Sequence, residues 1–115
     1  MRNKLLWKPT QKRIENTSLF EFIKHVNKKH KEKIVDFNAL YQWSINNRNY
    51  FWDEVWNFYN VIGKKGDGPY IKPENSLPGS KFFPNGLLNY AENMLKKSDS
   101  DTAITFWSED KIKKN

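Results

Sequence analysis

Few side chains in this sequence could act in catalysis or bind a metal, and their spacing does not bring them together. His25 and His30 lie five positions apart in a lysine-rich segment, with no carboxylate at the spacing of a metal ligand. Asp53 and Glu54 are adjacent, and adjacent residues of a helix point to different sides, so their carboxylates cannot form an acid–base pair. We therefore expect both histidines at the surface or at a helix end, without a metal.

The sequence also lacks the motifs of nucleophilic catalysis and phosphate binding. The absence of cysteine excludes disulfides, thiolate zinc sites and a cysteine nucleophile. Ser18, Ser44 and Ser80 have neither flanking elbow glycines nor an evident base, and Glu109–Asp110 falls in a terminal turn. The segment KKGDG, residues 64–68, lacks the G-x-x-x-x-G-K-[ST] spacing of a phosphate loop. We expect no catalytic, cofactor-binding or metal-binding residue in this chain.

Composition indicates one folded domain with a basic N-terminal third. The 115 residues include 5 Trp, 5 Tyr and 8 Phe, enough large apolar side chains for a modest core. The net charge of +7 comes from residues 1–33, which keeps open a partner such as a nucleic acid or an anionic membrane. Lysine greatly outnumbers arginine, however, which favours a solvated face over base or phosphate recognition. We expect no nucleic-acid partner.

The sequence contains no signal for a membrane or for export. No apolar run approaches the ~20 residues that a membrane-spanning helix needs, and the first residues lack an export signal. Together with the lack of cysteine, this favours a cytoplasmic location and no membrane partner.

Helical periodicity dominates the first half of the chain. We expect a short helix from Thr10 to Ile14, and a second that begins at a Ser18–Glu21 capping box. The apolar face of the second helix is Leu19, Phe22, Ile23 and Val26. A third helix is capped by Asp36, and its inward residues are Phe37, Leu40 and Tyr41.

A fourth helix lies within NYFWDEVWNFYNVIG, residues 49–63, and precedes a long irregular segment. Its aromatic stripe predicts burial, and Gly63 suits a left-handed C-terminal cap. Residues 64–85 are rich in Gly and Pro, so we expect extended chain and turns that bury Tyr70, Ile71, Leu77, Phe82 and Phe83.

A last helix and one strand complete the predicted elements. The helix runs from Asn85 or Gly86 to Lys96 or Lys97, and Thr102–Trp107 is a strand of β-branched and aromatic residues. A lone strand cannot satisfy its own backbone groups. We therefore expect its partner strand in another chain or in sequence beyond Asn115, so that the chain is part of a longer protein.

Four sequence blocks resemble the N-terminal region of the acetoacetyl-CoA synthetases (acetoacetate–CoA ligases). The most specific is "LPGSKFFPNGLLNYAENML", Leu77–Leu95, which is similar to the family's Pro-Gly, aromatic pair and Leu-Asn-Tyr-Ala-Glu-Asn-Leu stretch. Leu6–Val26 resembles the family's Leu-Trp-x-Pro…Arg-Ile opening, and Asp36–Gly63 its Trp-Ser and Phe-Trp…Val-Trp blocks. Asp101–Asp110 resembles the first strand of the family's large domain. The related acetyl- and propionyl-CoA synthetases lack the Leu-Trp-x-Pro opening, which favours the acetoacetyl branch.

This resemblance implies a fold and a reaction. The implied fold is mainly α: a helical N-terminal cap, a long extended loop, one helix and the first β-strand of a truncated α/β adenylating domain. The implied domains are the cap, residues 1–97, and the start of the large AMP-binding domain, residues 98–115. The parent enzyme would use ATP, Mg²⁺ and CoA to form acetoacetyl-CoA through an acyl-adenylate. Its catalytic motifs do not occur here, so we expect an inactive chain whose partner is the large domain, with the oligomeric state left open.

Two alternatives remain at this point. The chain could be a free-standing basic helical adaptor or nucleic-acid-binding module that uses its N-terminal third. Within the family, it could instead belong to an acetyl- or propionyl-CoA synthetase.

Overall fold

The computed structural model describes residues 3–73, 75–107, 109 and 113–114, and it is mainly helical. Its helices are α1 (Gln11–Glu15), α2 (Ser18–His30), α3 (Phe37–Asn46), α4 (Arg48–Phe58) and α5 (Tyr90–Met94). Its strands are β1 (Ile71–Lys72), β2 (Lys81–Phe82), β3 (Phe106–Trp107) and β4 (Lys113–Lys114). None of the helices in the described part of the chain is long and apolar enough to cross a membrane.

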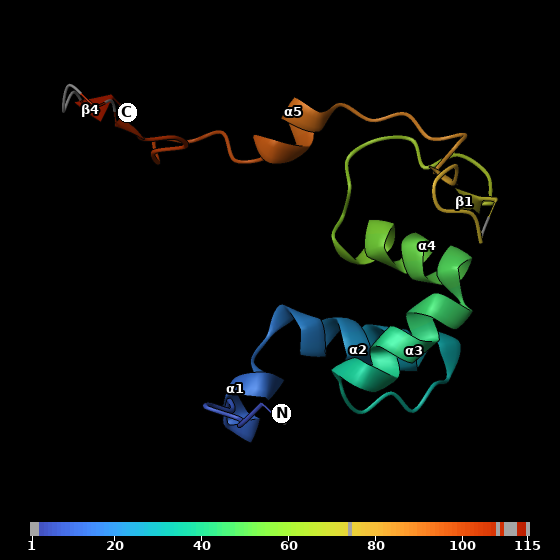
Figure 1. Ribbon diagram of the computed structural model, residues 1–115. Coiled ribbons are helices and arrows are strands. Elements are labelled where there is room, and N and C mark those ends of the chain that lie inside the picture. The colour runs from blue at the N-terminus through green and yellow to red at the C-terminus, as the bar shows by residue number, and fades with distance from the viewer. Residues whose placement is uncertain (1–2, 74, 108, 110–112, 115) are drawn as a thin grey trace.

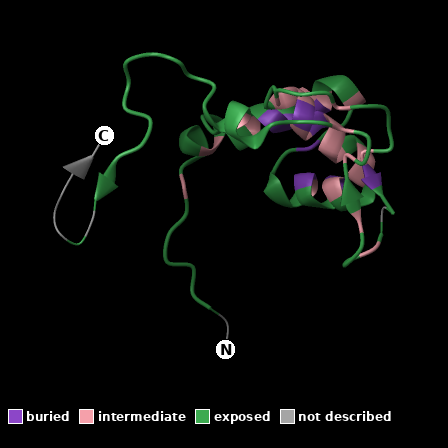
Figure 2. Ribbon diagram, turned by 90° about the horizontal axis from the view of Figure 1, so that it is seen from above, coloured by how far each residue is buried: buried purple, intermediate pink, exposed green. Residues whose placement is uncertain are grey.

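The core lies among α2, α3 and α4, which lie together in Figure 1. Figure 2 shows that the buried residues gather in this part of the molecule. The buried cluster consists of Phe22, Ile23, Val26, Ile34, Leu40 and Trp43. The partly buried residues packed against it are Ala39, Phe51, Val55 and Phe58. The predicted apolar face of α2 is therefore confirmed for Phe22, Ile23 and Val26, but Leu19 is 40% exposed. The aromatic stripe of α4 contributes Phe51 and Phe58 to the edge of the core, whereas Tyr59 is 50% exposed.

The predicted caps are partly confirmed. Thr10 caps α1 and Asp36 caps α3, each accepting a hydrogen bond from a backbone N–H three residues on. At α2 the prediction is wrong by one residue, since the side chain of Thr17 accepts from the N–H of Phe20 and Ser18 is the first helical residue. Both residues carry a hydroxyl, so the sequence pattern did not distinguish them.

In α3, the inward face differs from the prediction. Leu40 is buried as expected, whereas Phe37 and Tyr41 are 60% and 51% exposed. Trp43 takes the inward place, where its ring lies 5.3 Å from that of His30. The core therefore covers a different side of α3 from the one that the spacing indicated.

Helix α4 ends earlier than predicted. Its last residue is Phe58, and Asn60 takes the left-handed conformation, with φ 50°. Gly63 is therefore not the cap of this helix. It has φ 152°, and a Cβ there would lie 2.5 Å from the carbonyl oxygen of Leu87, so glycine allows two chain segments to approach closely.

Residues 64–87 form the expected extended segment, which folds back along α4. Strands β1 and β2 pair antiparallel, with Ile71 opposite Phe82. Ile71 is buried as predicted, but Leu77 is 81% exposed. The ring of Phe82 lies 5.0 Å from that of Trp52, and Phe83 lies 4.9 Å from Trp56, so α4 contacts this segment through its aromatic residues.

The last predicted helix is much shorter than expected. Lys64 and Leu87 exchange two backbone hydrogen bonds of 2.8 Å, which keep Leu87 extended. Asn89 then caps α5 by accepting from the N–H of Glu92, so the helix comprises only Tyr90–Met94. The apolar spacing in residues 86–95 indicated a helix, but the pairing with Lys64 prevents it from starting earlier.

The expected strand Thr102–Trp107 is reduced to β3, and its partner lies within the chain. Phe106 pairs with Lys114 and Trp107 with Lys113 in antiparallel register. The expectation that the second strand must come from elsewhere is therefore wrong for these two residues. Figure 1 shows the chain after α5 stretching away from the helices toward β4. The radius of gyration of 19.0 Å, compared with about 13 Å for a compact 100-residue domain, reflects this arm.

Candidate functional site

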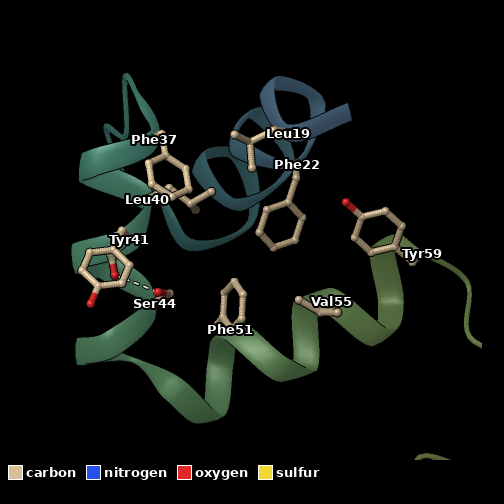
Figure 3. Close-up of a pocket in the computed structure, with 9 residues that line it drawn as sticks. All are labelled: Leu19, Phe22, Phe37, Leu40, Tyr41, Ser44, Phe51, Val55 and Tyr59. Atoms are coloured by element: carbon tan, nitrogen blue, oxygen red, sulfur yellow. Dashed lines mark hydrogen bonds between the residues drawn. The ribbon is translucent and has the colours of Figure 1, made fainter. Parts of the chain in front are cut away.

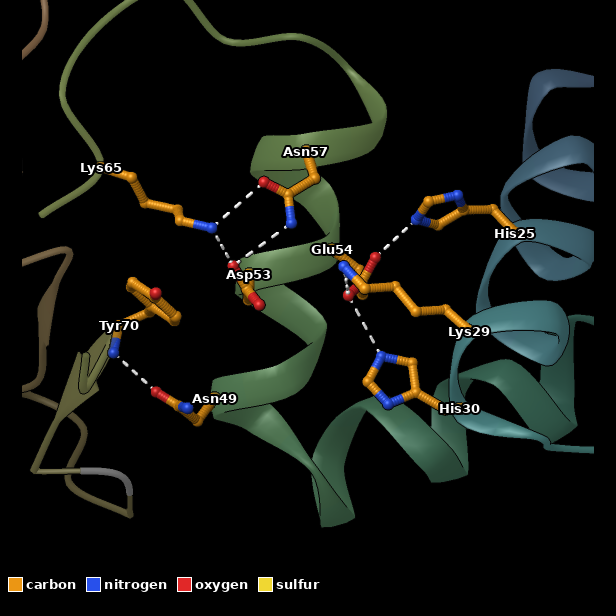
Figure 4. Close-up of polar contacts among 9 residues, drawn as sticks. All are labelled: His25, Lys29, His30, Asn49, Asp53, Glu54, Asn57, Lys65 and Tyr70. Atoms are coloured by element: carbon orange, nitrogen blue, oxygen red, sulfur yellow. Dashed lines mark hydrogen bonds and ion pairs between the residues drawn. The ribbon is translucent and has the colours of Figure 1, made fainter. Parts of the chain in front are cut away.

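The most concentrated charged cluster of the chain surrounds Glu54. This carboxylate belongs to α4, is 0% exposed and faces α2. His25 Nε2 lies 2.5 Å from Glu54 Oε2, while Lys29 Nζ and His30 Nε2 lie 2.8 Å and 3.2 Å from Oε1. Figure 4 shows these three side chains of α2 pointing toward Glu54. We call these four residues the Glu54 cluster.

Two of the three basic side chains share one side of α2. Lys29 lies four positions after His25, about one helical turn along the same face, whereas His30 is the last residue of α2 and reaches Glu54 from the end of the helix. Glu54 lies three residues after Phe51 and four before Phe58, on the apolar stripe of α4 that faces α2. Packing of the two helices therefore brings the carboxylate against the basic side chains.

The electrostatics of the cluster favour the charged carboxylate. Burial alone would raise the pKa of Glu54, because desolvation opposes ionisation. Hydrogen bonds from Lys29, His25 and His30 outweigh that effect and hold the pKa of Glu54 below its ordinary value. The cluster thus satisfies a charge that would otherwise be costly to bury.

The contacts of the Glu54 cluster join two helices. Both carboxylate oxygens already accept hydrogen bonds, and the carboxylate has no contact with solvent. In the part of the chain that the structure describes, no group of three His, Cys, Asp or Glu side chains could hold a metal ion. The cluster connects α2 to α4.

The expected position at a helix end is confirmed for His30, which is the last residue of α2. Both histidines also contact a carboxylate that local spacing did not indicate, because it lies 24 to 29 residues away. The side chains of His25 and His30 are only 33% and 20% exposed. The signal that was available is the acidic residue on the apolar stripe of α4, because a carboxylate there requires a partner from the helix opposite.

Asp53 points away from Glu54, as predicted for adjacent helical residues. Its carboxylate pairs with Lys65, whose Nζ also donates to Asn57 Oδ1 at 3.1 Å. The ammonium of Lys65 lies 5.0 Å from the centre of the Tyr70 ring. Burial opposes the charge on Lys65, but the hydrogen bond with Asp53 prevails and raises the pKa of Lys65. These contacts attach the segment that contains Lys65 and Tyr70 to α4 (Figure 4).

The KKGDG segment, residues 64–68, contacts other parts of the chain through its lysine and one of its glycines. Its Lys65 is engaged by Asp53, and Gly66 packs directly on another loop. A Cβ at Gly66, where φ is +75°, would lie 2.3 Å from the carbonyl oxygen of Asn85. The conformation that glycine permits here serves contact between two loops.

Two of the three serines considered as nucleophiles donate hydrogen bonds to backbone carbonyls. Ser44 Oγ donates to the carbonyl of Tyr41 at 2.7 Å, and Ser80 Oγ donates to that of Pro73 at 2.6 Å. Ser18 is exposed at the first position of α2. Asp110, of the Glu109–Asp110 pair, lies outside the described residues.

An apolar groove of about 240 Å³ opens between α2, α3 and α4. Figure 3 shows its lining side chains converging from the three helices. They are Leu19, Phe22, Phe37, Leu40, Tyr41, Ser44, Phe51, Val55 and Tyr59. All nine are uncharged, so the groove offers apolar contact and a few hydroxyl groups, without a group that could neutralise a phosphate.

Polar contacts attach α5 to the end of α4. The side-chain oxygen of Asn93 accepts from the N–H of Ile62 at 2.8 Å, and its amide donates back to the carbonyl of Ile62 at 2.9 Å. Lys96 Nζ reaches the carbonyls of Tyr59 and Asn60 at 3.4 Å and 3.1 Å. We call these contacts of Asn93 and Lys96 the polar clamp.

Comparison with known proteins gives this arrangement its context. The Acetyl-coenzyme A synthetase N-terminus family profile matches residues 37–94, which is half of the chain. The chain is 35% identical over 107 residues to the acetoacetyl-coenzyme A synthetase of Rhizobium meliloti, and 34% identical over 107 residues to the acetoacetyl-CoA synthetase of Danio rerio. These alignments cover 93% and 92% of this chain but 16% of each relative.

A further relative is the malonamoyl-CoA synthetase of Penicillium aethiopicum, 28% identical over 92% of this chain and 15% of that protein. No solved structure matches this one. The resemblance carried by the four sequence blocks is confirmed. The chain is similar to part of the acetoacetyl-CoA synthetases, and it belongs to the acetyl-coenzyme A synthetase N-terminus family.

Proposed function

We propose that this chain is the N-terminal module of a ligase that converts acetoacetate, ATP and CoA to acetoacetyl-CoA, AMP and pyrophosphate. The observation that carries the proposal is the 35% identity to the Rhizobium meliloti acetoacetyl-coenzyme A synthetase along 93% of the chain. Because the chain spans only about a sixth of that relative's length, the reaction is a property of the longer protein. The module contributes a folded cap to it.

The chemistry of the proposed reaction explains why the module would be inactive alone. Acetoacetate attacks the α-phosphate of ATP and pyrophosphate leaves; the CoA thiol then displaces AMP from the acyl-adenylate. Such steps need donors and cations directed at phosphate oxygens. The described lysines near the core direct their ammonium groups at Glu54 and Asp53 instead. ATP, Mg²⁺ and CoA would therefore bind in the remainder of the enzyme.

The use of basic residues within the module supports this role over polyanion binding. Lys29 is paired with Glu54, and Lys24 forms an exposed pair with Glu21. Part of the basic charge of α2 is thus neutralised inside the module, which argues against a nucleic-acid surface. The absence of cysteine from the sequence supports a cytoplasmic location for the enzyme.

The relatives also suggest a substrate class. Their names specify acetoacetyl-CoA and malonamoyl-CoA, and the corresponding acids both carry a second carbonyl group β to the carboxylate. We assign short β-carbonyl acids to the parent enzyme, with acetoacetate first. Acetate, which lacks this group, is the natural comparison because it separates the acetoacetyl branch from the acetyl branch.

A chimera tests the proposal. This chain would replace the matching region of the Rhizobium meliloti enzyme, and acetoacetate-dependent release of pyrophosphate would be measured. We expect turnover within about tenfold of the unmodified relative, because a cap of the same family should support the same large domain. A folded, soluble chimera that releases no pyrophosphate with acetoacetate would contradict the proposal.

A further inference from the structure

The helix α5 is attached to the rest of the molecule by its polar side chains. The polar clamp joins it to residues 59–62, and the backbone pairing of Lys64 with Leu87 holds the chain just before it. A surface helix normally buries its apolar side chains and leaves its polar ones in water. This segment shows the reverse arrangement.

The apolar side chains of the same segment are exposed. Five of them lie within residues 87–95, and each is more than half exposed: Leu87 71%, Leu88 52%, Tyr90 74%, Met94 61% and Leu95 59%. Single exposed apolar residues are common on protein surfaces, but a local concentration of this kind marks an interaction site. We call residues 87–95 the α5 segment.

The composition of the α5 segment identifies the kind of partner. Glu92 is its single charged residue, so the segment would meet an apolar protein surface rather than a phosphate backbone. Leu87–Met94 lies inside the region matched by the family profile, and the Rhizobium meliloti relative is about six times as long as the region aligned with this chain. A large body of polypeptide therefore accompanies this segment in those relatives.

We propose that the α5 segment is a preset docking face for the larger part of the ligase, with the polar clamp fixing its orientation relative to α4. This proposal rests on the function proposed above. It adds the surface that contacts the rest of the enzyme, the α5 segment, and the contacts that orient this surface, the polar clamp. Because the clamp uses only polar groups, it leaves Leu88 and Met94 available for the partner. The segment is thus oriented before the partner binds, which reduces the entropy lost on docking.

Thiol labelling tests this placement directly, because the chain has no cysteine of its own. Leu88→Cys and Met94→Cys would be introduced separately into the 115-residue chain and into the chimera with the Rhizobium meliloti enzyme. Labelling sites would be resolved by peptide mass analysis. We expect both cysteines to react rapidly in the isolated chain and at least about tenfold more slowly in the chimera, because the partner covers them.

Val35→Cys is the matched control, since Val35 is 74% exposed and lies outside the α5 segment. We expect its labelling rate to be the same in both proteins. Equal rates for Leu88→Cys and Met94→Cys in both proteins would overturn the docking proposal, and so would equal slowing of the control. If the chimera does not fold, the complete protein that carries this chain is the second host for the same three labels.

The outcomes separate this proposal from the proposed function. An active chimera whose labelled α5 segment stays reactive overturns the docking face and leaves the enzymatic proposal standing. A protected α5 segment in a folded but inactive chimera supports the docking face and contradicts the enzymatic proposal. Labelling of the isolated chain that slows as its concentration rises would assign the face to a second copy and overturn the proposal.

Discussion

Replacing Glu54 with glutamine tests whether the Glu54 cluster holds α2 against α4. The carboxylate accepts hydrogen bonds from His25, Lys29 and His30, and it is completely buried. Glu54→Gln keeps the size of the side chain and one acceptor oxygen. It removes the negative charge. It also replaces one acceptor oxygen by an NH₂ group, which cannot accept a hydrogen bond from the basic side chains.

The expected cost follows from the exposure of the partners. A hydrogen bond to a charged group contributes about 1.5–3 kcal/mol, and breaking a buried ion pair costs about 3–5 kcal/mol. Lys29 and His25 are 48% and 33% exposed, so they can turn toward water when the charge is gone. We therefore expect Glu54→Gln to lower the free energy of unfolding by about 2–3 kcal/mol, which is less than the cost of breaking a pair whose two partners are both buried.

Urea denaturation measures this cost, followed by helical circular dichroism and by the fluorescence of the buried Trp43 and Trp56. Glu21→Gln is the matched control, because Glu21 pairs with Lys24 on the outside of α2 and both side chains are 57% exposed. We expect the control to cost less than about 1 kcal/mol. Equal free energies of unfolding for the two variants would refute a stabilising role for the cluster.

Four further predictions concern acidity, two contacts and activity. The pKa of Glu54 lies below its ordinary value of 4.5 in the folded chain. The stabilisation from the charged carboxylate is therefore complete above pH 4.5 and is lost as the pH falls through the folded pKa. The urea midpoint should drop on acidification, and it should drop less in Glu54→Gln. Asn93→Ala should remove two hydrogen bonds to Ile62 and speed amide hydrogen exchange in α5, while exchange in α2 stays unchanged. Gly66→Ala should lower stability by about 1–3 kcal/mol in urea denaturation, because the new Cβ would meet the carbonyl of Asn85; an unchanged midpoint would contradict this. The purified chain should show no acetoacetate-dependent exchange of pyrophosphate into ATP, and detectable exchange would overturn the assignment of catalysis to the rest of the enzyme.

Local signals in the sequence predicted the helical part of the fold well. The apolar spacing of Phe22, Ile23 and Val26 identified the buried face of α2, and Asp36 was recognised as a cap. Such features depend on residues within one or two helical turns, so a single sequence contains them.

The errors arise where residues far apart in the sequence meet. The length of α5 depends on backbone pairing between Lys64 and Leu87, which no local pattern reveals. The partner of β3 was expected elsewhere because β4 is only two lysines, Lys113–Lys114, with no strand-like composition. In each case tertiary contact decided the conformation.

The Glu54 cluster was missed for the same reason. His25 and His30 were judged by their own neighbours, whereas their partner lies on another helix. An acidic residue in the middle of an aromatic stripe was the available clue. Because a buried charge needs a partner, an acidic residue at this position predicts basic side chains on the helix that packs against it.

Steady-state kinetics of the complete protein that carries this chain test the central claim most directly. Formation of acyl-CoA would be measured with ATP, Mg²⁺, CoA and either acetoacetate or acetate. We expect formation of acetoacetyl-CoA, with a higher kcat/KM for acetoacetate than for acetate. Absence of acid-dependent AMP formation with acetoacetate, in a folded complete protein, would contradict it.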